Sequence, residues 1–446
     1  MNEPLAAESG LARDRLERRL PDAKPTYASG EAVGEANRCL YCHDAPCVQA
    51  CPTGIDIPGF IRKIATGNLR GSARTIPSAN LLGYSCARVC PVEVLCVGAC
   101  VYNGWHRYPP IQIGRLQRYA VETTLRQDGT TLFEKAKPTG KKVACVGAGP
   151  ASLAAAGYLA LEGVEVTLFE RRKLAGGLNL TGVAPYKMNA EGAMLEVDFI
   201  RSLGVTIREG VEIGRDVAAA KLLADFDAVF IGAGLGADSK LGIPGEDGQG
   251  VTGATAWIER MKLDPGFKLA AASRAAVIGG GNTAIDAARE LKRLGLPDVV
   301  IVYRRGASDM PGYRHELELA YKEGVRLMER AVPKEFVRDS GGRLTGLALD
   351  GGRQVTCDLA LIAIGQAKLR ELAGQFPGVA SDAKGCIVVE EATGRTGNPK
   401  VFAGGDALGG ELVVTAAQDA KRAARAICAL LGVTVRPDAA MNAGHK

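Results

Sequence analysis

The pattern of hydrophobic and polar positions changes near residue 139. Before that point, short stretches with apolar residues at helical spacing, such as residues 57–65 and 116–125, alternate with cysteine-rich loops. After it, apolar runs of four to seven residues, bounded by glycines, alternate with amphipathic helices, as they do in parallel βαβ units. The pattern therefore predicts a mainly helical N-terminal domain followed by doubly wound α/β folds.

Several of the later apolar runs end in glycine, and together they indicate two nucleotide-binding folds rather than one. These runs cover residues 143–147, 228–232, 275–279 and 359–365. Segments rich in proline and glycine at 242–250 and 365–368 are expected where the chain enters and leaves an inserted domain. The predicted division is a helical domain over 1–138, a discontinuous Rossmann-like domain over 139–246 and 366–446, and an inserted Rossmann-like domain over 247–365.

Length, charge and hydropathy narrow the class of protein. The 446 residues and 57 glycines suit two or three α/β domains. Basic residues exceed acidic ones by only 6, and no block of like charge favours nucleic acid or a membrane as a partner. We find neither a signal-peptide core nor an apolar run of the about 18 to 20 residues that cross a bilayer, so we expect a soluble, cytoplasmic protein. Residues 1–21 mix acidic and basic residues around Leu11, Leu16 and Leu20 and predict a short surface helix.

Eight of the twelve cysteines lie in two runs, which are the strongest chemical signal in the chain. The runs contain Cys39, Cys42, Cys47 and Cys51, followed by proline, and then Cys86, Cys90, also followed by proline, Cys96 and Cys100. Both resemble ferredoxin spacing, in which closely spaced thiolates share one cluster and the cysteine beside proline binds another. Eight thiols would fit two 4Fe–4S clusters. Disulfides and zinc sites are the alternatives, disfavoured by the missing secretory signal and by the Cys-Pro placement.

The first nucleotide motif follows the apolar run that ends at Gly147. It predicts a tight turn into a helix, and Glu170 ends the next strand 23 residues later. The residues of the turn and helix start are Gly147, Gly149, Pro150, Ala151 and Ser152. Glycines let the backbone approach a pyrophosphate at the helix N-terminus, and the acidic side chain accepts hydrogen bonds from a ribose. Ser152 stands where a third glycine is usual, which weakens the motif slightly.

Two further segments indicate that this nucleotide is FAD. Gly176, Gly177 and Leu178 follow the acidic residue, while Gly405 and Asp406 precede a helical run over residues 415–429. The aspartate would hold the ribityl chain, and the N-terminus of the following helix would face the flavin ring. A helix cap is the alternative role for Asp406.

A second glycine motif, in the inserted domain, predicts a site for a nicotinamide nucleotide. Its candidate residues are Gly279, Gly281, Asn282 and Thr283. The next strand end has no acidic residue but carries Arg304 and Arg305, which suit the 2′-phosphate of NADPH. NADH stays open, because two arginines at a strand end can also be merely solvated. No Cys-x-x-Cys occurs in or after the first nucleotide fold, so a dithiol reductase of the thioredoxin reductase type is not expected.

Taken together, these motifs resemble the glutamate synthase small-subunit superfamily over nearly the whole chain. Within it, the cysteine-rich residues 45–58 and 96–117 resemble the flavoprotein subunits of bacterial dihydropyrimidine dehydrogenases. This resemblance implies an electron-input subunit that takes hydride from NAD(P)H onto FAD and passes single electrons through clusters to a partner subunit. The partner in that family carries FMN, further clusters and the pyrimidine site, where uracil or thymine is reduced. A small subunit of glutamate synthase, or of another NAD(P)H-dependent reductase complex, is the alternative.

The resemblance also implies a particular set of cluster ligands. One cluster would use Cys39, Cys42, Cys47 and Cys100, and the other Cys51, Cys90, Cys96 and the side-chain oxygen of Gln117. This scheme leaves Cys86 without a cluster, whereas spacing alone predicts eight cysteine ligands. The eighth ligand is therefore either Cys86 or Gln117.

Overall fold

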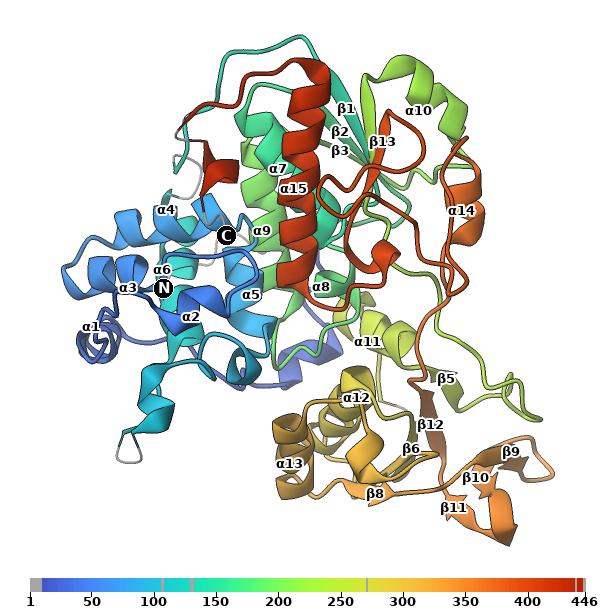
Figure 1. Cartoon of the computed structure of the whole chain (residues 1–446). Coiled ribbons are helices and arrows are strands. Elements are labelled where there is room, and N and C mark those ends of the chain that lie inside the picture. The colour runs from blue at the N-terminus through green and yellow to red at the C-terminus, as the bar shows by residue number, and fades with distance from the viewer. Residues whose placement is uncertain (1–9, 106–107, 129–131, 270–271, 438, 444–446) are drawn as a thin grey trace. The chain divides into compact units, whose positions relative to one another are not determined.

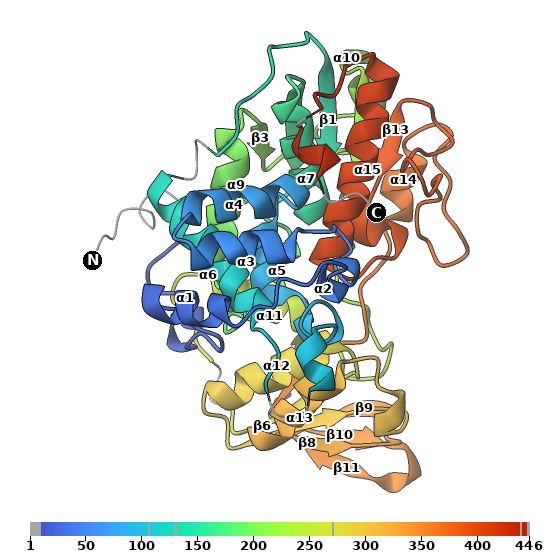
Figure 2. The same ribbon diagram turned by 60° about the vertical axis from the view of Figure 1, so that its left-hand side comes forward.

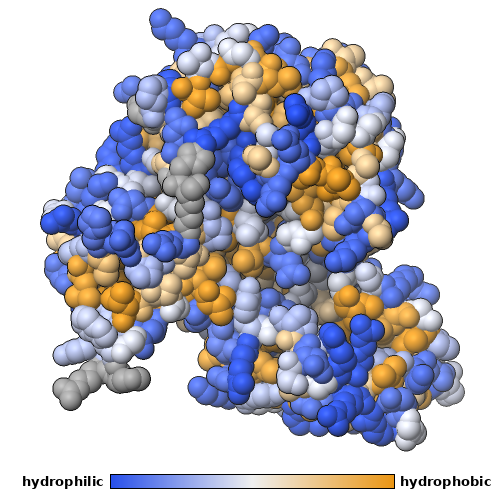
Figure 3. All heavy atoms as spheres, viewed as in Figure 1, coloured by the Kyte–Doolittle hydropathy of each residue, from blue (hydrophilic) through white to orange (hydrophobic). Residues whose placement is uncertain are grey.

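The computed structural model describes residues 10–105, 108–128, 132–269, 272–437 and 439–443. The chain divides into two compact units (Figures 1 and 2). Unit 1 consists of Met1–Ala23, Leu180–Glu191 and Gly236–Ala367, and unit 2 of Lys24–Asn179, Gly192–Leu235 and Lys368–Lys446. On the face drawn in Figure 3, hydrophilic and hydrophobic residues are interspersed. Within the described residues, no helix combines the length and apolar character of a membrane span.

The N-terminal part of unit 2 is helical, as the sequence pattern predicts. Its helices are α1 (Ser29–Asn37), α2 (Pro46–Gln49), α3 (Ile57–Ala65), α4 (Leu69–Ala79), α5 (Gly83–Val89) and α6 (Ile113–Asp128). Helix α3 begins where the Asp56 carboxylate accepts the Gly59 amide at 2.9 Å, and α4 begins in the same way at Asn68. The apolar positions of α3 at helical spacing, including Phe60 and Ile64, are buried.

The rest of unit 2 is a parallel five-stranded sheet in the order β13-β4-β1-β2-β3. Its strands are β1 (Lys142–Val146), β2 (Glu165–Glu170), β3 (Thr206–Glu209), β4 (Ala228–Ile231) and β13 (Val401–Ala403). Its helices are α7 (Pro150–Leu161), α9 (Ala190–Ser202), α10 (Ala219–Asp225), α14 (Arg370–Gly374) and α15 (Val413–Leu431). β1 and β4 are apolar and almost wholly buried, as central strands covered on both faces must be. The chain passes between the units at α8 (Leu178–Thr181) and at the start of α9.

Unit 1 contains a second parallel sheet, in the order β5-β12-β6-β7-β8, and a three-stranded antiparallel sheet, β11-β10-β9. The parallel strands are β5 (Val251–Gly253), β6 (Arg274–Ile278), β7 (Asp298–Val302), β8 (Arg326–Met328) and β12 (Leu359–Ile362). The others are β9 (Pro333–Arg338), β10 (Leu344–Leu349) and β11 (Gln354–Thr356), and the helices are α11 (Ala254–Leu263), α12 (Asn282–Arg293) and α13 (Arg314–Lys322). The predicted fold class, two Rossmann-like folds after a helical domain, is confirmed.

The N-terminal stretch corrects one expectation, because it is not a surface helix. Residues 1–9 of that prediction lie outside the described part of the chain. Residues Leu16–Arg19 form a 3₁₀ turn, and Leu16 and Leu20 are buried in the core of unit 1. Arg15 and Glu17 are buried as well, because the guanidinium and the carboxylate pair at 2.8 Å. The charges that suggested a solvated face satisfy each other inside the fold.

The segment Leu180–Glu191 belongs to unit 1 because buried polar side chains fasten it there. Lys262, on α11, is fully buried, and its ammonium donates to the carbonyls of Val183 at 3.0 Å and Met188 at 2.9 Å. The Tyr186 hydroxyl donates to Asp286 of α12 at 2.8 Å. Both of these buried side chains thus donate to an acceptor inside the fold, as buried polar groups in stable proteins do.

Candidate functional site

The first glycine motif forms a tight turn between β1 and α7. Gly147 has a φ of +86°, and a Cβ there would lie 2.8 Å from the Cα of Ala233, so only glycine fits. Pro150 is the first residue of α7 and lacks an N–H, while the amides of Ala151 and Ser152 stand in the first helical turn, where no intrahelical acceptor exists. The turn therefore offers two amides and the positive end of a helix dipole to an anion.

The second glycine pair lies directly against this turn. Gly177 has a φ of +54°, and a Cβ there would lie 2.6 Å from the Cα of Gly149. The Gly176 amide donates to the Ala148 carbonyl at 2.8 Å, and Leu178 follows as the first residue of α8. Gly149 and Gly177, which are 28 residues apart in the sequence, thus make one backbone surface without side chains of their own, which a phosphate chain can approach.

Glu170 stands at the end of β2 and holds the glycine turn in place. Its carboxylate is buried and accepts the Ala148 amide at 2.8 Å through one oxygen and the Arg172 amide at 2.9 Å through the other. An ionised carboxylate has about four acceptor positions, so capacity remains for a ribose hydroxyl. Glu170 therefore has a structural task that the sequence motif did not reveal.

Ser152 is fully buried at the position where the motif usually has its third glycine, and a glycine elsewhere in the sheet makes room for its side chain. Its hydroxyl donates to the Val146 carbonyl at 3.3 Å. A Cβ on Gly232, just after β4, would collide with the Ser152 hydroxyl. The close helix-to-strand approach that a third glycine normally permits is thus provided by a glycine on the neighbouring strand.

Asp406 lies in a turn that packs against the start of α7. Its neighbour Gly405 has a φ of +73°, and a Cβ there would lie 3.0 Å from the Cβ of Ala151. Burial raises the pKa of Asp406 to about 6, with Lys368 opposing that rise. The residue that precedes α15 is Leu412, and no side chain caps that helix, so Asp406 is not its cap. A small pocket lies beside this turn and is lined by Ala407 and Lys368.

These segments converge at the carboxyl ends of parallel strands, where open α/β sheets bind nucleotides. Helices α7 and α15 pack side by side (Figure 1), and both begin at this edge of the sheet. The amides, the bare glycine surface and the half-buried Asp406 carboxylate are the polar groups that a dinucleotide with a polyol chain requires. The residues present fit FAD.

The second glycine motif has the same construction in unit 1. Gly279 has a φ of +147°, and a Cβ there would collide with the Ala363 carbonyl. Gly281 precedes α12, and Thr283 stands in the first turn of that helix. The side-chain oxygen of Asn282 accepts the Tyr313 amide at 2.9 Å, so Asn282 ties the turn to the start of α13. The geometry provides a second anion-binding helix N-terminus.

The two arginines that follow β7 are not equivalent. Both are exposed, but the Arg305 guanidinium donates to the Tyr303 hydroxyl at 3.0 Å and lies over the same ring. The Tyr303 hydroxyl in turn donates to the Asp309 carbonyl at 2.7 Å. Arg304 makes no hydrogen bond or ion pair with any residue in the described ranges. Arg304 is therefore the more available of the two for an anionic ligand.

Cys39, Cys42, Cys47 and Cys100 surround one cavity in the helical part of unit 2. The remaining wall of this cavity is mostly apolar, with Ile57, Ile61 and Ile113. Burial, and then the thiols of Cys39, Cys100 and Cys42, raise the pKa of the Cys47 thiol to about 12. Thiolates crowded into such a pocket need a cationic partner, which an iron cluster supplies.

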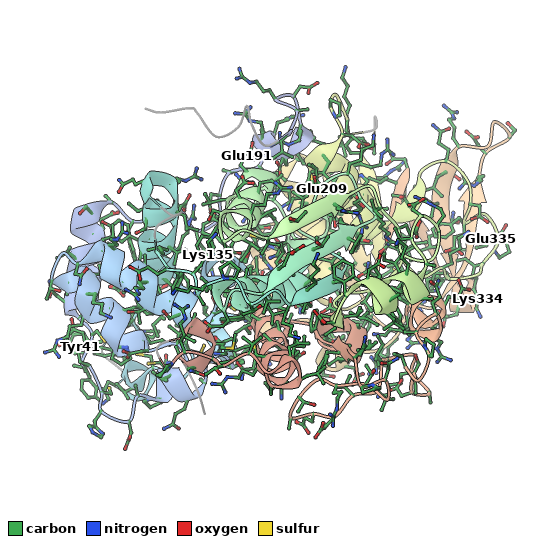
Figure 4. All side chains as sticks on the ribbon, turned by 90° about the horizontal axis from the view of Figure 1, so that it is seen from above. Tyr41, Lys135, Glu191, Glu209, Lys334 and Glu335 are labelled. Atoms are coloured by element: carbon green, nitrogen blue, oxygen red, sulfur yellow. The ribbon has the colours of Figure 1, made fainter. Side chains whose placement is uncertain are left out.

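Tyr41, between the first two cysteines, is a site residue that the sequence did not indicate. Its φ of +51° lies in the left-handed region, which is uncommon for a residue with a side chain. The turn lets the Tyr41 amide donate to the Cys39 thiol, and this lowers the pKa of Cys39 against the larger effect of burial. Figure 4 shows Tyr41 among the helices and Glu209 on the sheet of the same unit.

The remaining cysteines form a second group. Burial raises the pKa of Cys96 to about 12, followed by the effects of the Cys51 and Cys47 thiols. A hydrogen bond with Cys86, and then burial, raise the pKa of Cys90 well above its usual range. Within the described residues, no three His, Cys, Asp or Glu side chains lie close enough to share one metal ion. The Cys86, Cys96 and Cys51 thiols all act on Cys90, so these four cysteines lie close to one another.

Of the two candidates for the eighth ligand, Cys86 belongs to this second group, and Gln117 lies on the helix packed against the one that carries Cys86. Cys86 is buried on α5, next to Cys90, and its sulfur accepts the Asn80 side-chain amide at 3.1 Å. Gln117 is buried on α6, which packs against α5, and its amide nitrogen donates to the Gly83 carbonyl at 2.7 Å. The amide oxygen is therefore the end of Gln117 that could bind a cluster.

Helix α5, which carries Cys86, begins on a carboxylate supplied by α9. Glu196 is buried and accepts the Tyr84 amide at 2.8 Å, the Ser85 amide at 3.2 Å and the Ser85 hydroxyl. Burial raises the pKa of Glu196 to about 7, against the hydrogen bonds from Ser85 and Tyr84 that lower it. The sheet part of unit 2 thus directly supports a cysteine-bearing helix.

Comparison with known proteins identifies both parts. Residues 17–129 match the family described as dihydropyrimidine dehydrogenase domain II, 4Fe-4S cluster, and residues 141–420 match the pyridine nucleotide-disulphide oxidoreductase family. The chain belongs to the FAD-dependent oxidoreductases with an N-terminal 4Fe–4S domain. Within this family it is 35% identical to the NAD-dependent dihydropyrimidine dehydrogenase subunit PreT of Escherichia coli K12, over 92% of this chain and 96% of that protein. It is 32% identical to the small chain of the NADPH glutamate synthase of the same organism, over 90% and 92%.

The fold of the family's pyridine nucleotide module is also found in solved structures. The thioredoxin reductase of T. acidophilum is 25% identical, with a TM-score of 0.53, and covers 65% of this chain and 98% of its own. Membership of the family establishes an NAD(P)H-dependent flavin and iron–sulfur oxidoreductase. Relatives of both kinds are named as a subunit or a small chain, and their names differ in the nucleotide and in the final reaction.

Proposed function

We infer that this chain is the electron-input subunit of a dihydropyrimidine dehydrogenase. The observation that carries the inference is that the FAD-type sheet and both cysteine groups lie in one compact unit. The match of residues 17–129 to the iron–sulfur domain of dihydropyrimidine dehydrogenase supports this substrate class over others. In this assignment, the helical part over 1–138 carries two 4Fe–4S clusters, the parts over 139–246 and 366–446 bind FAD, and 247–365 bind NAD(P)H.

Each group of residues has a definite task in this function. The Ala151 and Ser152 amides would face the FAD pyrophosphate, Glu170 its ribose, and Asp406 the ribityl chain. Gly281 and Thr283 would face the pyrophosphate of the nicotinamide nucleotide in the same way. FAD, when bound, supplies the conversion between a two-electron donor and one-electron acceptors. The cysteine pockets, walled by apolar side chains, would keep water from the clusters.

The proposed pyrimidine reaction takes place on a protein partner. The three parts of the chain are assigned to FAD, NAD(P)H and clusters, and relatives of both kinds are named as a subunit or a small chain. Large apolar side chains are exposed near the cysteines in sequence, namely Leu40, Val94 and Trp105, which are 44%, 57% and 51% exposed. Such exposure suits a protein surface that docks on a partner. The proposed partner is a subunit that carries FMN and iron–sulfur clusters and reduces uracil or thymine.

A glutamate synthase small subunit is the second candidate, and one observation favours it. Arg304 is exposed and without a partner in the described structure, at the strand end where a 2′-phosphate would bind. The glutamate synthase relative is named for NADPH, whereas the dihydropyrimidine dehydrogenase relative is named as NAD-dependent. A clear preference for NADPH together with turnover by a glutamate synthase large chain would favour this alternative.

The deciding experiment compares the chain alone with the chain plus its co-purified partner. Alone, it should oxidise NAD(P)H with a dye acceptor but not reduce uracil; with the partner, it should form dihydrouracil. Cys47→Ser should spare most dye reduction and abolish uracil reduction, while Cys357→Ala, which removes an isolated cysteine of unit 1, should spare both. Uracil reduction by the partner-free chain, at a rate comparable with dye reduction, would contradict the proposal.

A further inference from the structure

Lys421 is a buried lysine in the middle of α15, and every one of its donors is used. The side chain is 1% exposed, and its ammonium donates to three main-chain carbonyls, those of Thr53 at 3.1 Å, Ala79 at 2.8 Å and Ala443 at 2.9 Å. An ammonium has three N–H donors and no acceptor, so three carbonyls satisfy it fully. Burial lowers the pKa of Lys421 to about 8, which leaves the amine mostly protonated at neutral pH.

Two of these three carbonyls belong to the segments that carry the second cysteine group. Thr53 is fully buried and follows Cys51 by two residues, and its hydroxyl lies 3.4 Å from the Cys51 sulfur. Ala79 precedes Asn80, whose side chain donates to the Cys86 sulfur at 3.1 Å. A single positive charge is therefore anchored between the Cys51 loop and the segment that supports Cys86.

The other end of this connection is the proposed flavin site. Helix α15 begins at Val413, shortly after Asp406, and Lys421 stands eight residues into it, about 12 Å along the helix axis. Helix α7, which begins at the first glycine motif, reaches the same place, because the Tyr158 hydroxyl donates to the Ala79 carbonyl at 3.0 Å. The Ala79 carbonyl thus accepts a hydrogen bond from each of the two helices that begin at the flavin site.

We propose that Lys421 is a positioning residue of the electron path, which fixes the Cys51 loop against α15 and raises the reduction potential of the cluster bound there. The proposal rests on the assignment of that cluster in the proposed function. Reduction adds a negative charge to a cluster, and a buried cation held nearby stabilises the reduced form more than the oxidised form. The charge acts strongly here because the side chain is shielded from water.

The test compares the full-length chain, reconstituted under anaerobic conditions, with three variants. Lys421→Met removes the charge and the donors while keeping a similar length, and Lys421→Arg keeps the charge and the donors. Lys384→Met removes an exposed lysine of the same unit and is the matched control. Redox titration followed by electron paramagnetic resonance reports the midpoint potential of each cluster, and iron analysis reports their occupancy.

We expect Lys421→Met to lower the reduced-to-oxidised ratio of one cluster at least tenfold at a fixed potential, which is about 59 mV for one electron. The other cluster should move less, Lys421→Arg should restore most of the ratio, and Lys384→Met should change nothing. Unchanged potentials of both clusters in a fully loaded Lys421→Met chain would overturn the proposal. Loss of half the iron in both Lys421 variants would also overturn it, because the residue would then be a packing element only.

The same measurements separate this inference from the cluster assignment. If the wild-type chain itself holds only one cluster, or none, the assignment of Cys51 fails before Lys421 is considered. If the wild type holds two clusters and the variants leave both potentials in place, only the role of Lys421 fails.

Discussion

Glu196 offers a quantitative test of how the sheet part of unit 2 supports helix α5. The folded pKa of about 7, against the ordinary 4.5, corresponds to about 3 kcal/mol at 1.36 kcal/mol per pH unit. The cause is burial of the carboxylate, which the bonds from Ser85 and Tyr84 only partly offset. Because the folded pKa is the higher one, the folded state binds the proton more tightly. This contribution of about 3 kcal/mol to the free energy of unfolding is therefore fully present below pH 4.5 and is lost as the pH rises through about 7.

Glu196→Gln removes this titration while keeping an acceptor oxygen for the α5 amides. The difference in unfolding free energy between wild type and Glu196→Gln should therefore change by about 2 to 3 kcal/mol between pH 5 and pH 8, with the wild type losing stability. Urea denaturation at four or five pH values under anaerobic conditions measures this difference. Glu165→Gln, at an exposed site on β2, is the control and should show a flat difference. A Glu196→Gln difference that is constant within about 0.5 kcal/mol over this range would show that Glu196 does not titrate with a raised pKa in the folded state.

Three further experiments, each with its own substitutions, test the nucleotide and cluster sites. Gly177→Ala should weaken FAD retention at least about tenfold. Gly210→Ala is the control, because Gly210 has a φ of +74° but open space around it, so that substitution should cause backbone strain only. The amount of FAD that stays bound after gel filtration distinguishes the two. Arg304→Ala should weaken the binding of NADPH at least about tenfold more than the binding of NADH, since it would remove a charge-assisted hydrogen bond to the 2′-phosphate. Equal small effects on both nucleotides in binding titrations would show that Arg304 is merely solvated. If Gln117 is the eighth cluster ligand, Cys86→Ser should leave the iron content unchanged and Gln117→Leu should lower it by about half. The opposite result in iron analysis would show that Cys86 is the eighth ligand.

The sequence was sufficient for the fold class and for the positions of both glycine motifs, because these depend on local signals. Apolar runs that end in glycine leave few alternatives to buried parallel strands. The antiparallel strands β9 to β11 escaped prediction, since Phe336 is the one buried residue of β9 and its residues do not form a continuous apolar run. Leu16 and Leu20 were misjudged because their burial depends on a core distant in sequence.

The supporting residues of the site could not be read from the sequence for the same physical reason. The pairing of Ser152 with Gly232 joins residues about 80 positions apart, and Lys421 contacts Thr53 across 368 positions. No short-range sequence pattern distinguishes Ser152 or Lys421 from an ordinary helix residue. The left-handed turn at Tyr41 also lacks the glycine or asparagine that normally announces one. Spacing could group the cysteines but could not decide between Cys86 and Gln117.

The cofactor content of the purified chain tests the proposed assignment of FAD and two clusters. After anaerobic reconstitution, we expect one FAD and about eight irons with matching acid-labile sulfide per chain, because each of the two proposed ligand sets would complete one 4Fe–4S cluster. A chain that binds zinc instead, or that holds fewer than about four irons, would contradict it.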